Sequence, residues 1–594
     1  MMRAWPPRGL AAPRIGRPAD WPPREYSARL IIKKGTTMTN ENDQEYLDEV
    51  STLNPVIGLS IEDVLASGRL VLNQAVLQPA IFAEQTAKLW KDWASIGLNQ
   101  SDLAPEPKDR RFSDTAFKEN KSYNKLVQGW LAWQNRMLEW VEMLDLDEVD
   151  REKARFLIQL YVDAMAPTNF LLGNPSALRS AYESRGQSLL AGLKNFIGDI
   201  RENGGMPSQV DKTAFTVGEN LGVSKGAVVH KSPILELIQY EPVTEKVKAR
   251  PIFIVPPQIN KFYLYDLSES NSFVKYLLKE GFQVFIVSWR NPSKEHSEWG
   301  LENYIDALDH AIDACLEVTG QDAINGVGAC AGGITFATAL AYFAGKGTLS
   351  RVNSLTLMVN VLESHNDDSV IGLFANDKTV ELAREKSAKA GILDGSETAR
   401  VFNWMRPNDL IWNYHVSNYL HGEKPPIFDI LYWNNDTTSL PAKLHSDFLD
   451  VFSTNPLSNP GTLTINGIDI DLKAVDCDVL ITGGTTDHIT PWQACYRSTK
   501  LFGGETSFVL STAGHIQSLL NPPTSSKRAY FLNSEIKETP KEWWETASEH
   551  SGSWWPHWST WLSEHANGEV EAPSALGSKM NAPGVPAPGT YVFD

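Results

Sequence analysis

The chain contains few cysteines. Among its 594 residues there are four, at positions 315, 330, 477 and 495. They form no C-x-x-C pair and show none of the spacings of a zinc site, so we expect no metal site. A disulfide framework is not expected either, and this cysteine usage favours a reducing cytoplasm.

The sequence also lacks an excess of positive charge and a clear membrane-spanning segment. The net charge of −18 argues against a general nucleic-acid binder, which needs a basic surface. One uncharged stretch, residues 328–345, approaches the length of a membrane span. It opens with glycines and carries two threonines, which favours a buried helix after a turn. We therefore expect no nucleic-acid partner and no transmembrane segment.

Residues 1–37 differ in composition from the rest of the chain. They hold eight basic and two acidic residues among many prolines. A targeting peptide would need an apolar stretch that this segment does not contain. We expect a basic, disordered extension.

Apolar spacing indicates helices in the first third of the chain. In "YNKLVQGWLAWQNRMLEWVEML", large apolar residues recur every three or four positions, which is typical of one face of a helix. Few strand-like runs interrupt this region. The pattern predicts a mostly helical N-terminal domain over residues 38–225.

From about residue 226 the pattern changes to short apolar runs separated by amphipathic segments. Such continuous runs are typical of strands buried on both faces, and hence of a parallel α/β sheet. Between about residues 363 and 470 the alternation fades, which predicts an insertion over the carboxyl edge of the sheet. The catalytic domain is expected over residues 226–594. The predicted strands are 251–257, 283–289, 322–328, 354–360, 478–484 and 507–514.

The turn "INGVGACAGGITF" at residues 324–336 surrounds one cysteine with glycines. It partly fits the dinucleotide motif G-x-G-x-x-A through Gly326, Gly328 and Ala331. That motif requires an acidic residue at the tip of the next strand, where this chain has Asn360. A second interpretation is a close strand–helix crossing with a buried, inert cysteine.

The third interpretation is a nucleophile elbow, in which Cys330 lies on a sharp turn between a strand and a helix. The amide of Ala331 would then point into the oxyanion hole. An α/β-hydrolase site also needs an acid and a histidine downstream, each following a strand. Asp487 follows the run 478–484, and His515 follows the next one. This order of residues favours the elbow and predicts an α/β-hydrolase fold.

Other residues compete for these roles. His488 is a second candidate base, but it directly follows the acid, so its side chain is expected to point elsewhere. A packing or hydrogen-bonding role suits it better. Cys315, Cys477 and Cys495 lie on or beside predicted core elements and are expected to be structural.

Several segments together resemble one family, the class I polyhydroxyalkanoate synthases. They include "PPQINKFYLYDLSESNSFVKYLLKEGFQVFIVSWRNP", "GACAGG", "RPNDLIWNYHVSNYLHGEKPPIFDILYWNNDTTSLP", "TTDHITPW", "AGHIQSLLNPP" and "GSWWPHW", in that order. The helical stretches "DRRFSDTAF" and "APTNFLLGNP" resemble the N-terminal domain of that family. The resemblance spans roughly residues 80–590.

The resemblance implies an acyltransferase that polymerises (R)-3-hydroxyacyl-coenzyme A into polyester. It implies Cys330 as nucleophile, Asp487 and His515 as its acid and base, and the Asn260 amide as second oxyanion donor beside Ala331. It also implies a cytoplasmic homodimer at the surface of polymer granules. No cofactor is expected, because the coenzyme A thioester is the substrate.

Two alternatives remain open from the residues alone. A thioesterase or an intracellular polyester depolymerase would use the same Cys-Asp-His triad. A non-enzymatic protein that coats granules would carry that triad by accident.

Overall fold

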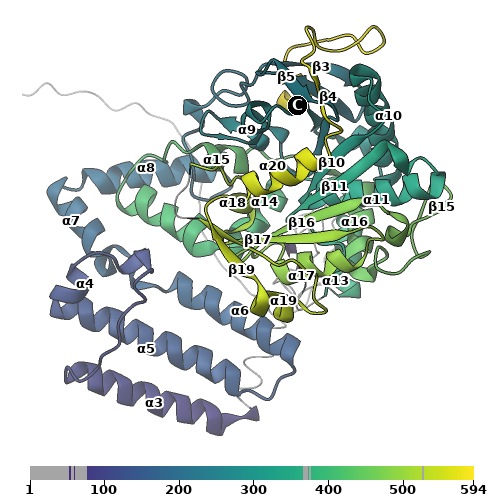
Figure 1. The fold of residues 1–594 in the computed structure, drawn as a ribbon. Helices are drawn as coiled ribbons and strands as arrows, with labels where there is room; N and C mark the ends of the chain where they lie inside the picture. The colour runs from purple at the N-terminus through teal and green to yellow at the C-terminus, as the bar shows by residue number, and fades with distance from the viewer. Residues whose placement is uncertain (1–51, 55–58, 61–76, 366–371, 373–375, 525–527) are drawn as a thin grey trace, which may run out of the picture. The chain divides into compact units, whose positions relative to one another are not determined.

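The computed structural model describes residues 52–54, 59–60, 77–365, 372, 376–524 and 528–594 (Figure 1). The predicted extension, residues 1–37, lies outside the described residues. The described part belongs to one unit, Val50–Asp594. The predicted domain boundary at residue 225 stays a prediction.

A ten-stranded sheet has the order β19-β18-β17-β16-β11-β10-β6-β9-β4-β3 (Figure 1). The six strands from β9 to β17 are parallel neighbours, and antiparallel strands flank them at both ends. The strands are β3 (Gly226–Lys231), β4 (Leu235–Tyr240), β6 (Ile252–Val255), β9 (Val284–Trp289), β10 (Ile324–Ala329), β11 (Val352–Met358), β16 (Asp478–Gly484), β17 (Thr506–Ser511), β18 (Ala529–Leu532) and β19 (Ser548–Ser551). The six predicted strands are confirmed as the parallel ones.

Alternate residues of the central strands enter two different apolar cores. Phe253 and Val255 of β6 belong to one core, which also contains residues of α10 (Leu301–Thr319) and α11 (Cys330–Lys346). Ile252 and Ile254 belong to the other, with α9 (Phe273–Lys279) and α20 (Trp555–Glu564). Side chains of a strand alternate between its faces, so continuous apolar runs fill both cores.

A long insertion separates β11 from β16, the position predicted for residues 363–470. It contains the helices α13 (Asp377–Ala390) and α14 (Gly395–Met405), and two π-helical turns follow them, η8 (Asn408–Trp412) and η9 (His415–Leu420). It continues with α15 (Asp429–Asn434) and α16 (Ala442–Thr454). The insertion leaves the sheet at the carboxyl end of β11, on the edge where an α/β sheet binds ligands.

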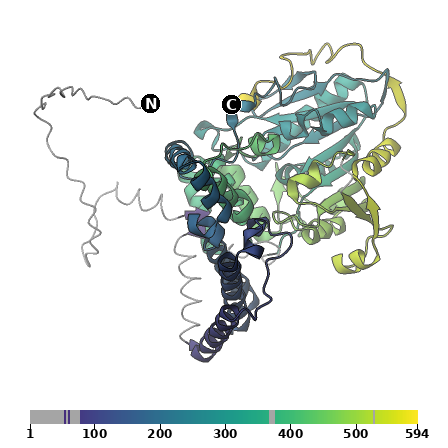
Figure 2. The ribbon, with the colours of Figure 1, turned by 90° about the vertical axis from the view of Figure 1, so that its left-hand side faces the viewer.

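Helices dominate the region before the sheet, as predicted. They are α3 (Pro79–Gly97), α4 (Ala116–Glu119), α5 (Lys121–Met143), α6 (Glu148–Ala164), α7 (Pro175–Glu183) and α8 (Gln187–Glu202). Figures 1 and 2 show α3, α5 and α6 side by side. The side chains of Asn120, Asp147 and Asn174 accept hydrogen bonds from the first-turn amides of α5, α6 and α7. These caps explain where the three helices begin.

Helix α8 packs closely against η9 of the insertion. A Cβ atom on Gly192 would overlap the backbone of Tyr419, so only glycine fits there. The Tyr419 hydroxyl donates to Asp199 over 2.8 Å, and the Asn195 amide donates to the carbonyl of Asn418 over 3.0 Å. The helical region therefore supports the insertion through specific contacts.

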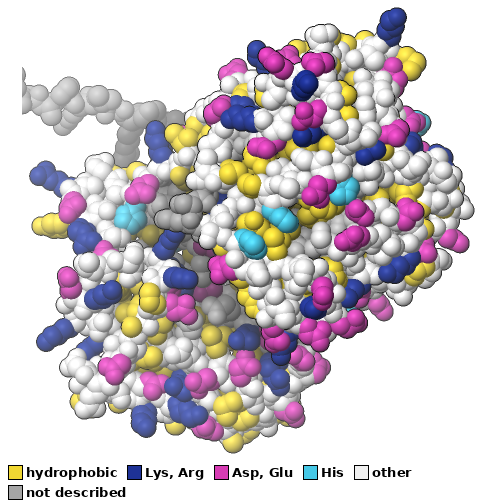
Figure 3. All heavy atoms as spheres, in the orientation of Figure 1, with side chains coloured by type: hydrophobic (Ala, Val, Ile, Leu, Met, Phe, Trp, Pro, Cys, Tyr) yellow, Lys and Arg dark blue, Asp and Glu magenta, His cyan; other side chains and the backbone are white. Residues whose placement is uncertain are grey.

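The surface carries mixed charge. On the face drawn in Figure 3, acidic and basic side chains are interspersed. Among the described residues, no helix is long and apolar enough to cross a membrane.

Replacing Trp558 should destabilise the fold. This side chain is fully buried, donates to the Thr356 hydroxyl over 2.9 Å and stacks on Phe273. We expect Trp558→Ala to lower the free energy of unfolding by about 3–5 kcal/mol, measured by chemical denaturation followed by circular dichroism. Trp90→Ala is the control, because Trp90 is 64% exposed, and its effect should stay within about 0.5 kcal/mol. Equal losses in the two variants would contradict the packing argument.

Candidate active site

The backbone turns sharply at Cys330, between β10 and α11. Cys330 has a φ angle of +47°, a conformation that costs a non-glycine residue strain. A Cβ atom on Gly332 would overlap the carbonyl oxygen of Pro256, and one on Gly328 would lie 2.8 Å from Gly333 Cα. Neighbouring backbone therefore approaches the turn more closely than any side chain would permit. The half-buried thiol is presented at the carboxyl edge of the sheet.

A second strained residue supports this turn from the next strand. Val359, just after β11, has a φ angle of +46°, which is unusual for a β-branched residue. It precedes Asn360, whose side-chain amide donates to the carbonyl oxygen of Cys330 over 2.7 Å. Asn360 is fully buried, so this bond is shielded from water. The bond anchors the backbone of the elbow.

Asp487 and His515 form a buried ion pair. Asp487 follows β16, His515 begins α18 (His515–Leu519) after β17, and Asp487 Oδ2 lies 2.7 Å from His515 Nδ1. The amides of Ile489 and Thr490 donate to Asp487 Oδ1 over 2.9 and 3.0 Å, and the Thr490 hydroxyl donates to Oδ2. The carboxylate is therefore fixed by several donors at once.

The imidazole of His515 connects the carboxylate to Cys330. After Asp487, the Cys330 side chain is the next group that raises the pKa of His515, which indicates that the two side chains are neighbours. Since Nδ1 faces Asp487, Nε2 is the nitrogen left for the thiol. The structure thus brings together the three side chains that the sequence predicted.

Charge and burial oppose each other at His515. Burial alone would lower the pKa of His515, but Asp487 and then Cys330 raise it to about 10. Burial would raise the pKa of Asp487, yet His515 and the Thr490 donors hold it below its ordinary value. Both residues are thereby favoured in their charged forms. An imidazole of raised pKa takes up the proton of a neighbouring thiol and keeps it, so the charged form of His515 is the one present after this transfer.

The two predicted oxyanion donors lie on segments that meet at the elbow. Ala331 is in the first turn of α11, where amides have no acceptor within the helix. Asn260 lies in the loop after β6, and this loop reaches α11 through the contact of Pro256 with Gly332. Asn260 is also paired with Thr437 of the insertion in an isolated β-bridge. The roles of the two amides stay predictions.

Comparison with known proteins identifies the family. Residues 108–277 match the family described as "Poly-beta-hydroxybutyrate polymerase (PhaC) N-terminus", and residues 251–522 match the alpha/beta hydrolase fold. Poly(3-hydroxyalkanoate) polymerase 1 of Ectopseudomonas oleovorans is 50% identical over 561 residues, which cover 94% of this chain and 100% of that protein. The chain belongs to the poly(3-hydroxyalkanoate) polymerase family.

Other members of the polymerase family also match over most of their length. Poly(3-hydroxyalkanoate) polymerase 2 of Ectopseudomonas oleovorans is 47% identical to this chain. The matched region covers 91% of this chain and 96% of that protein. The poly(3-hydroxyalkanoate) polymerase subunit of Cupriavidus necator is 38% identical. Here the matched region covers 87% of this chain and 89% of that protein. The family predicted from the sequence is confirmed. These comparisons do not separate classes within the family, so class I stays a prediction.

The other cysteines differ from Cys330 in environment. Cys315 on α10 and Cys495 on α17 (Trp492–Arg497) are fully buried, and burial raises their pKa values well above the ordinary range. Burial also raises the pKa of Cys477, to about 12. All three thiols stay protonated and unreactive near neutral pH. They have the environments expected of structural cysteines.

His488 lies in a different environment from His515. Burial is the main cause that lowers the pKa of His488 to about 4, and nearby Arg406 of the insertion lowers it further. Within the described part of the chain, its Nδ1 has no hydrogen-bond partner. His488 is therefore neutral near neutral pH, and Asp487 forms its ion pair with His515 instead. His488 is poorly placed to replace His515 as the base. Its packing role stays a prediction.

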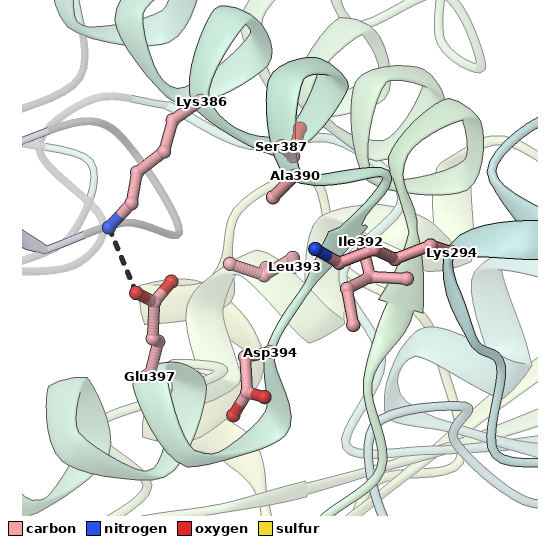
Figure 4. A pocket seen from close by; sticks show the side chains of 8 residues that line it. All are labelled: Lys294, Lys386, Ser387, Ala390, Ile392, Leu393, Asp394 and Glu397. Atoms are coloured by element: carbon pink, nitrogen blue, oxygen red, sulfur yellow. Dashed lines mark hydrogen bonds and ion pairs between the residues drawn. The ribbon is translucent and has the colours of Figure 1, made fainter. Parts of the chain in front are cut away.

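A cavity of about 200 Å³ lies in the insertion, away from these residues (Figure 4). Lys386 Nζ and Glu397 Oε1 form an ion pair across it at 2.9 Å. None of its lining residues belongs to the predicted site. The other lining residues are Lys294, Ser387, Ala390, Ile392, Leu393 and Asp394.

Sequence reasoning missed two residues that support the triad. Asn360 was considered only as the residue that fails the dinucleotide motif, although it ends a predicted strand at the catalytic edge. Thr490 follows the acid by three residues, and that spacing could have indicated a side chain that returns to the carboxylate. Among the residues that the structure describes, no group of three His, Cys, Asp or Glu side chains could hold a metal ion.

Asp487→Asn should change how stability depends on pH. The raised pKa of His515 means that its protonated form stabilises the fold up to about pH 6.5, the ordinary value. This contribution is lost as the pH rises through the folded value of about 10. In Asp487→Asn the carboxylate no longer offsets the effect of burial, so the pKa of His515 is lower than in the wild type. The variant therefore has less stability to lose as the pH rises. We expect thermal unfolding midpoints to fall more between about pH 6.5 and 9.5 in the wild type than in Asp487→Asn.

Asp478→Asn is the matched control for this measurement. Asp478 also contacts a histidine, with its Oδ2 atom 3.0 Å from His565 Nε2, but it is half-exposed and lies at the start of β16. This variant should keep the pH dependence of the wild type. The same flattening in both variants would show that the effect is not specific to the triad.

Proposed function

We propose that this chain transfers 3-hydroxyacyl groups from (R)-3-hydroxyacyl-coenzyme A to Cys330 and links them into a polyester. The observation that carries the proposal is a strained cysteine at a strand–helix turn, next to a buried histidine–aspartate pair. Membership of the polymerase family supplies the substrate class. A hydrolase or a coat protein is not favoured, because the relatives described above are all named polymerases.

Acylation of Cys330 begins with loss of its proton to His515. The sulfur then attacks the thioester carbonyl, and the oxyanion that forms is stabilised by the Ala331 and Asn260 amides, an effect of about 3 kcal/mol per donor. The bond between the carbonyl carbon and the sulfur of coenzyme A breaks. Its electron pair stays on that sulfur, which receives the proton from His515. Exchanging one thioester for another costs little free energy.

Acylation also prepares His515 for the next step. Cys330 contributes to the raised pKa of His515. When its sulfur carries an acyl group it has no negative charge, so the pKa of His515 falls. The imidazole then holds its proton less tightly and gives it up more readily, to the leaving sulfur of coenzyme A. Asp487 keeps it in the tautomer whose Nε2 faces the reacting atoms.

Elongation uses the hydroxyl of a second hydroxyacyl group. His515, oriented by Asp487, removes the hydroxyl proton while the oxygen attacks the acyl carbon on Cys330. A C–O ester bond forms, the C–S bond breaks, and the electron pair returns to sulfur. Water would compete for the same carbon, so the insertion over the carboxyl edge serves to exclude it.

Finer assignments complete the proposal. We assign the chain to class I, acting as a homodimer on cytoplasmic polymer granules, with 3-hydroxybutyryl-coenzyme A as its substrate. The sequence resemblance supports these assignments. Competing a four-carbon with an eight-carbon hydroxyacyl-coenzyme A, and analysing the polymer composition, tests the substrate. Preferential incorporation of the longer monomer would overturn the four-carbon assignment.

The central test follows coenzyme A and insoluble polymer together. Purified protein given 3-hydroxybutyryl-coenzyme A should release coenzyme A and form polymer, without a matching amount of free hydroxy acid. Cys330→Ala should release none, whereas Cys495→Ala should retain most activity because that thiol is buried and protonated. Release of soluble hydroxy acid instead of polymer would establish a hydrolase. Full activity in Cys330→Ala would exclude the proposed nucleophile.

Asp487→Asn and His515→Gln should fail at different steps. His515 is the only proposed base for the thiol, so its replacement should abolish both acylation and chain growth. Asp487 acts through His515 and matters most when the weakly acidic hydroxyl is activated. Its replacement should leave measurable acylation while polymer yield falls by about a hundredfold or more. Single-turnover acylation and steady-state polymer yield measure the two steps, and equal losses in both for Asp487→Asn would show that Asp487 matters no more for the hydroxyl than for the thiol.

A further inference from the structure

Residues 584–594, which we call the tail, are bound to one edge of the sheet (Figure 1). The Val228 amide of β3 donates to the carbonyl of Val585 over 2.9 Å. The fully buried carboxylate of Glu236, on β4, accepts a hydrogen bond from the Tyr591 amide over 3.0 Å. The tail is therefore fixed to β3 and β4.

Lys261 joins the tail to the loop that carries a proposed oxyanion donor. It directly follows Asn260, and its Nζ atom donates to the main-chain oxygen of Asp594 over 2.8 Å. Lys261 is 5% exposed, so its ammonium group lies in the interior. Burying an ammonium group is costly, and an apolar side chain of similar size avoids that cost. Stability alone therefore does not explain a lysine at this position.

The main chain around Asn260 is also held from a second side, by the insertion. The Thr438 amide donates to the carbonyl of Ile259 over 3.0 Å, and Trp433 Nε1 of α15 donates to the carbonyl of Lys261 over 2.7 Å. A trans peptide group is planar, so its N–H points away from its C=O. The Asn260 amide therefore points away from Thr438, and it has no acceptor among the described residues.

Three attachments thus hold the segment 259–261, and they bind it to different parts of the molecule. Two bind it to the insertion, whereas Lys261 binds it to the tail and, through the tail, to the sheet. Cys330 directly follows the central strand β10 of the same sheet. We propose that Lys261 is a positioning residue that keeps the Asn260 amide in place to donate to the oxyanion formed when Cys330 is acylated.

This inference rests on the proposed function, since it assigns Lys261 a role in the acylation of Cys330. A donor stabilises an oxyanion only when it lies at the position of that oxygen, and a displacement of about 1 Å can cost about a hundredfold in rate. Loss of the Lys261 bond should therefore slow formation of the tetrahedral intermediate. Binding of the thioester should be unaffected, because Lys261 acts through the Asn260 amide.

The test compares two reactions of the Cys330 thiol. Acylation by 3-hydroxybutyryl-coenzyme A forms an oxyanion, whereas alkylation by iodoacetamide displaces iodide from a tetrahedral carbon and forms none. Mass spectrometry of the peptide that contains Cys330 follows both reactions over time. For acylation the protein is in excess over the substrate, so that its concentration dependence gives a limiting rate and a half-saturation concentration.

Lys261→Met should separate these quantities. Its limiting rate of acylation should fall by about ten- to a hundredfold, with a half-saturation concentration within about twofold of the wild type. Its rate of alkylation should also stay within about twofold of the wild type, because the thiol and its base are unchanged. A lysine that served packing alone would not slow one reaction and spare the other.

Lys231→Met is the matched control. Lys231 Nζ also binds the tail, donating to Thr590 Oγ1 over 2.8 Å, and it forms an ion pair with Glu236. This lysine lies on β3, and its replacement leaves the bond between Lys261 and Asp594 in place. Its side chain is 48% exposed, so both reactions should stay within about twofold of the wild type.

The outcomes separate the inference from the function on which it rests. Equal slowing of acylation and alkylation in Lys261→Met, or no slowing of either, would overturn the positioning role. The same holds if Lys261→Met lacks the circular dichroism spectrum of the wild type, since Lys261 then serves the fold, or if Lys231→Met acylates as slowly as Lys261→Met. If wild-type Cys330 is alkylated but never acylated, the proposed function fails and the inference fails with it.

Discussion

The backbone turn at Cys330 is the constraint on which the site depends. A side chain at φ +47° is strained, and the turn persists because its surroundings leave no alternative. Gly332 lets the loop after β6 touch the start of α11, and Gly328 lets the strand approach the same helix. The Asn360 amide holds the Cys330 carbonyl from the neighbouring strand. The glycines around this cysteine thus serve close backbone contacts rather than flexibility.

Burial and charge act together on the side chains of the proposed triad. The Asp487 carboxylate is held by two amides and a hydroxyl, so it remains charged in a site that would otherwise neutralise it. That charge makes His515 a stronger base than a free imidazole. The remaining cysteines stay protonated, because burial raises their pKa values and carboxylates near Cys477 and Cys495 raise them further. The reactivity proposed for Cys330 therefore depends on its neighbour His515 and not on the thiol alone.

The same edge of the sheet gathers elements that are far apart in sequence. The insertion between β11 and β16 pairs with the loop of Asn260 through the bridge at Thr437, and it packs against α8 of the helical region. Acyl transfer to a hydroxyl requires that water be kept from the acyl enzyme. The contacts of the insertion with α8 and with the Asn260 loop provide a physical basis for such a cover.

The sequence by itself predicted the buried strands, the fold and the three residues proposed as the triad. Continuous apolar runs identify buried parallel strands, and catalytic residues of this fold follow such strands, so Cys330, Asp487 and His515 could be recognised from their positions. The helical character of the first region followed from its apolar period. Each of these inferences depends on local pattern, which a linear chain records directly.

Only the tertiary structure decided what surrounds those residues. The bond from Asn360 to Cys330 and the Thr490 donors on Asp487 are properties of side-chain directions across neighbouring elements. Such directions depend on packing between segments, and no spacing in the chain encodes them. Packing between segments also explains why Asp487 forms an ion pair with His515 and not with its sequence neighbour His488. Residues next to each other in sequence point apart, while the partners of the triad come from three different strands.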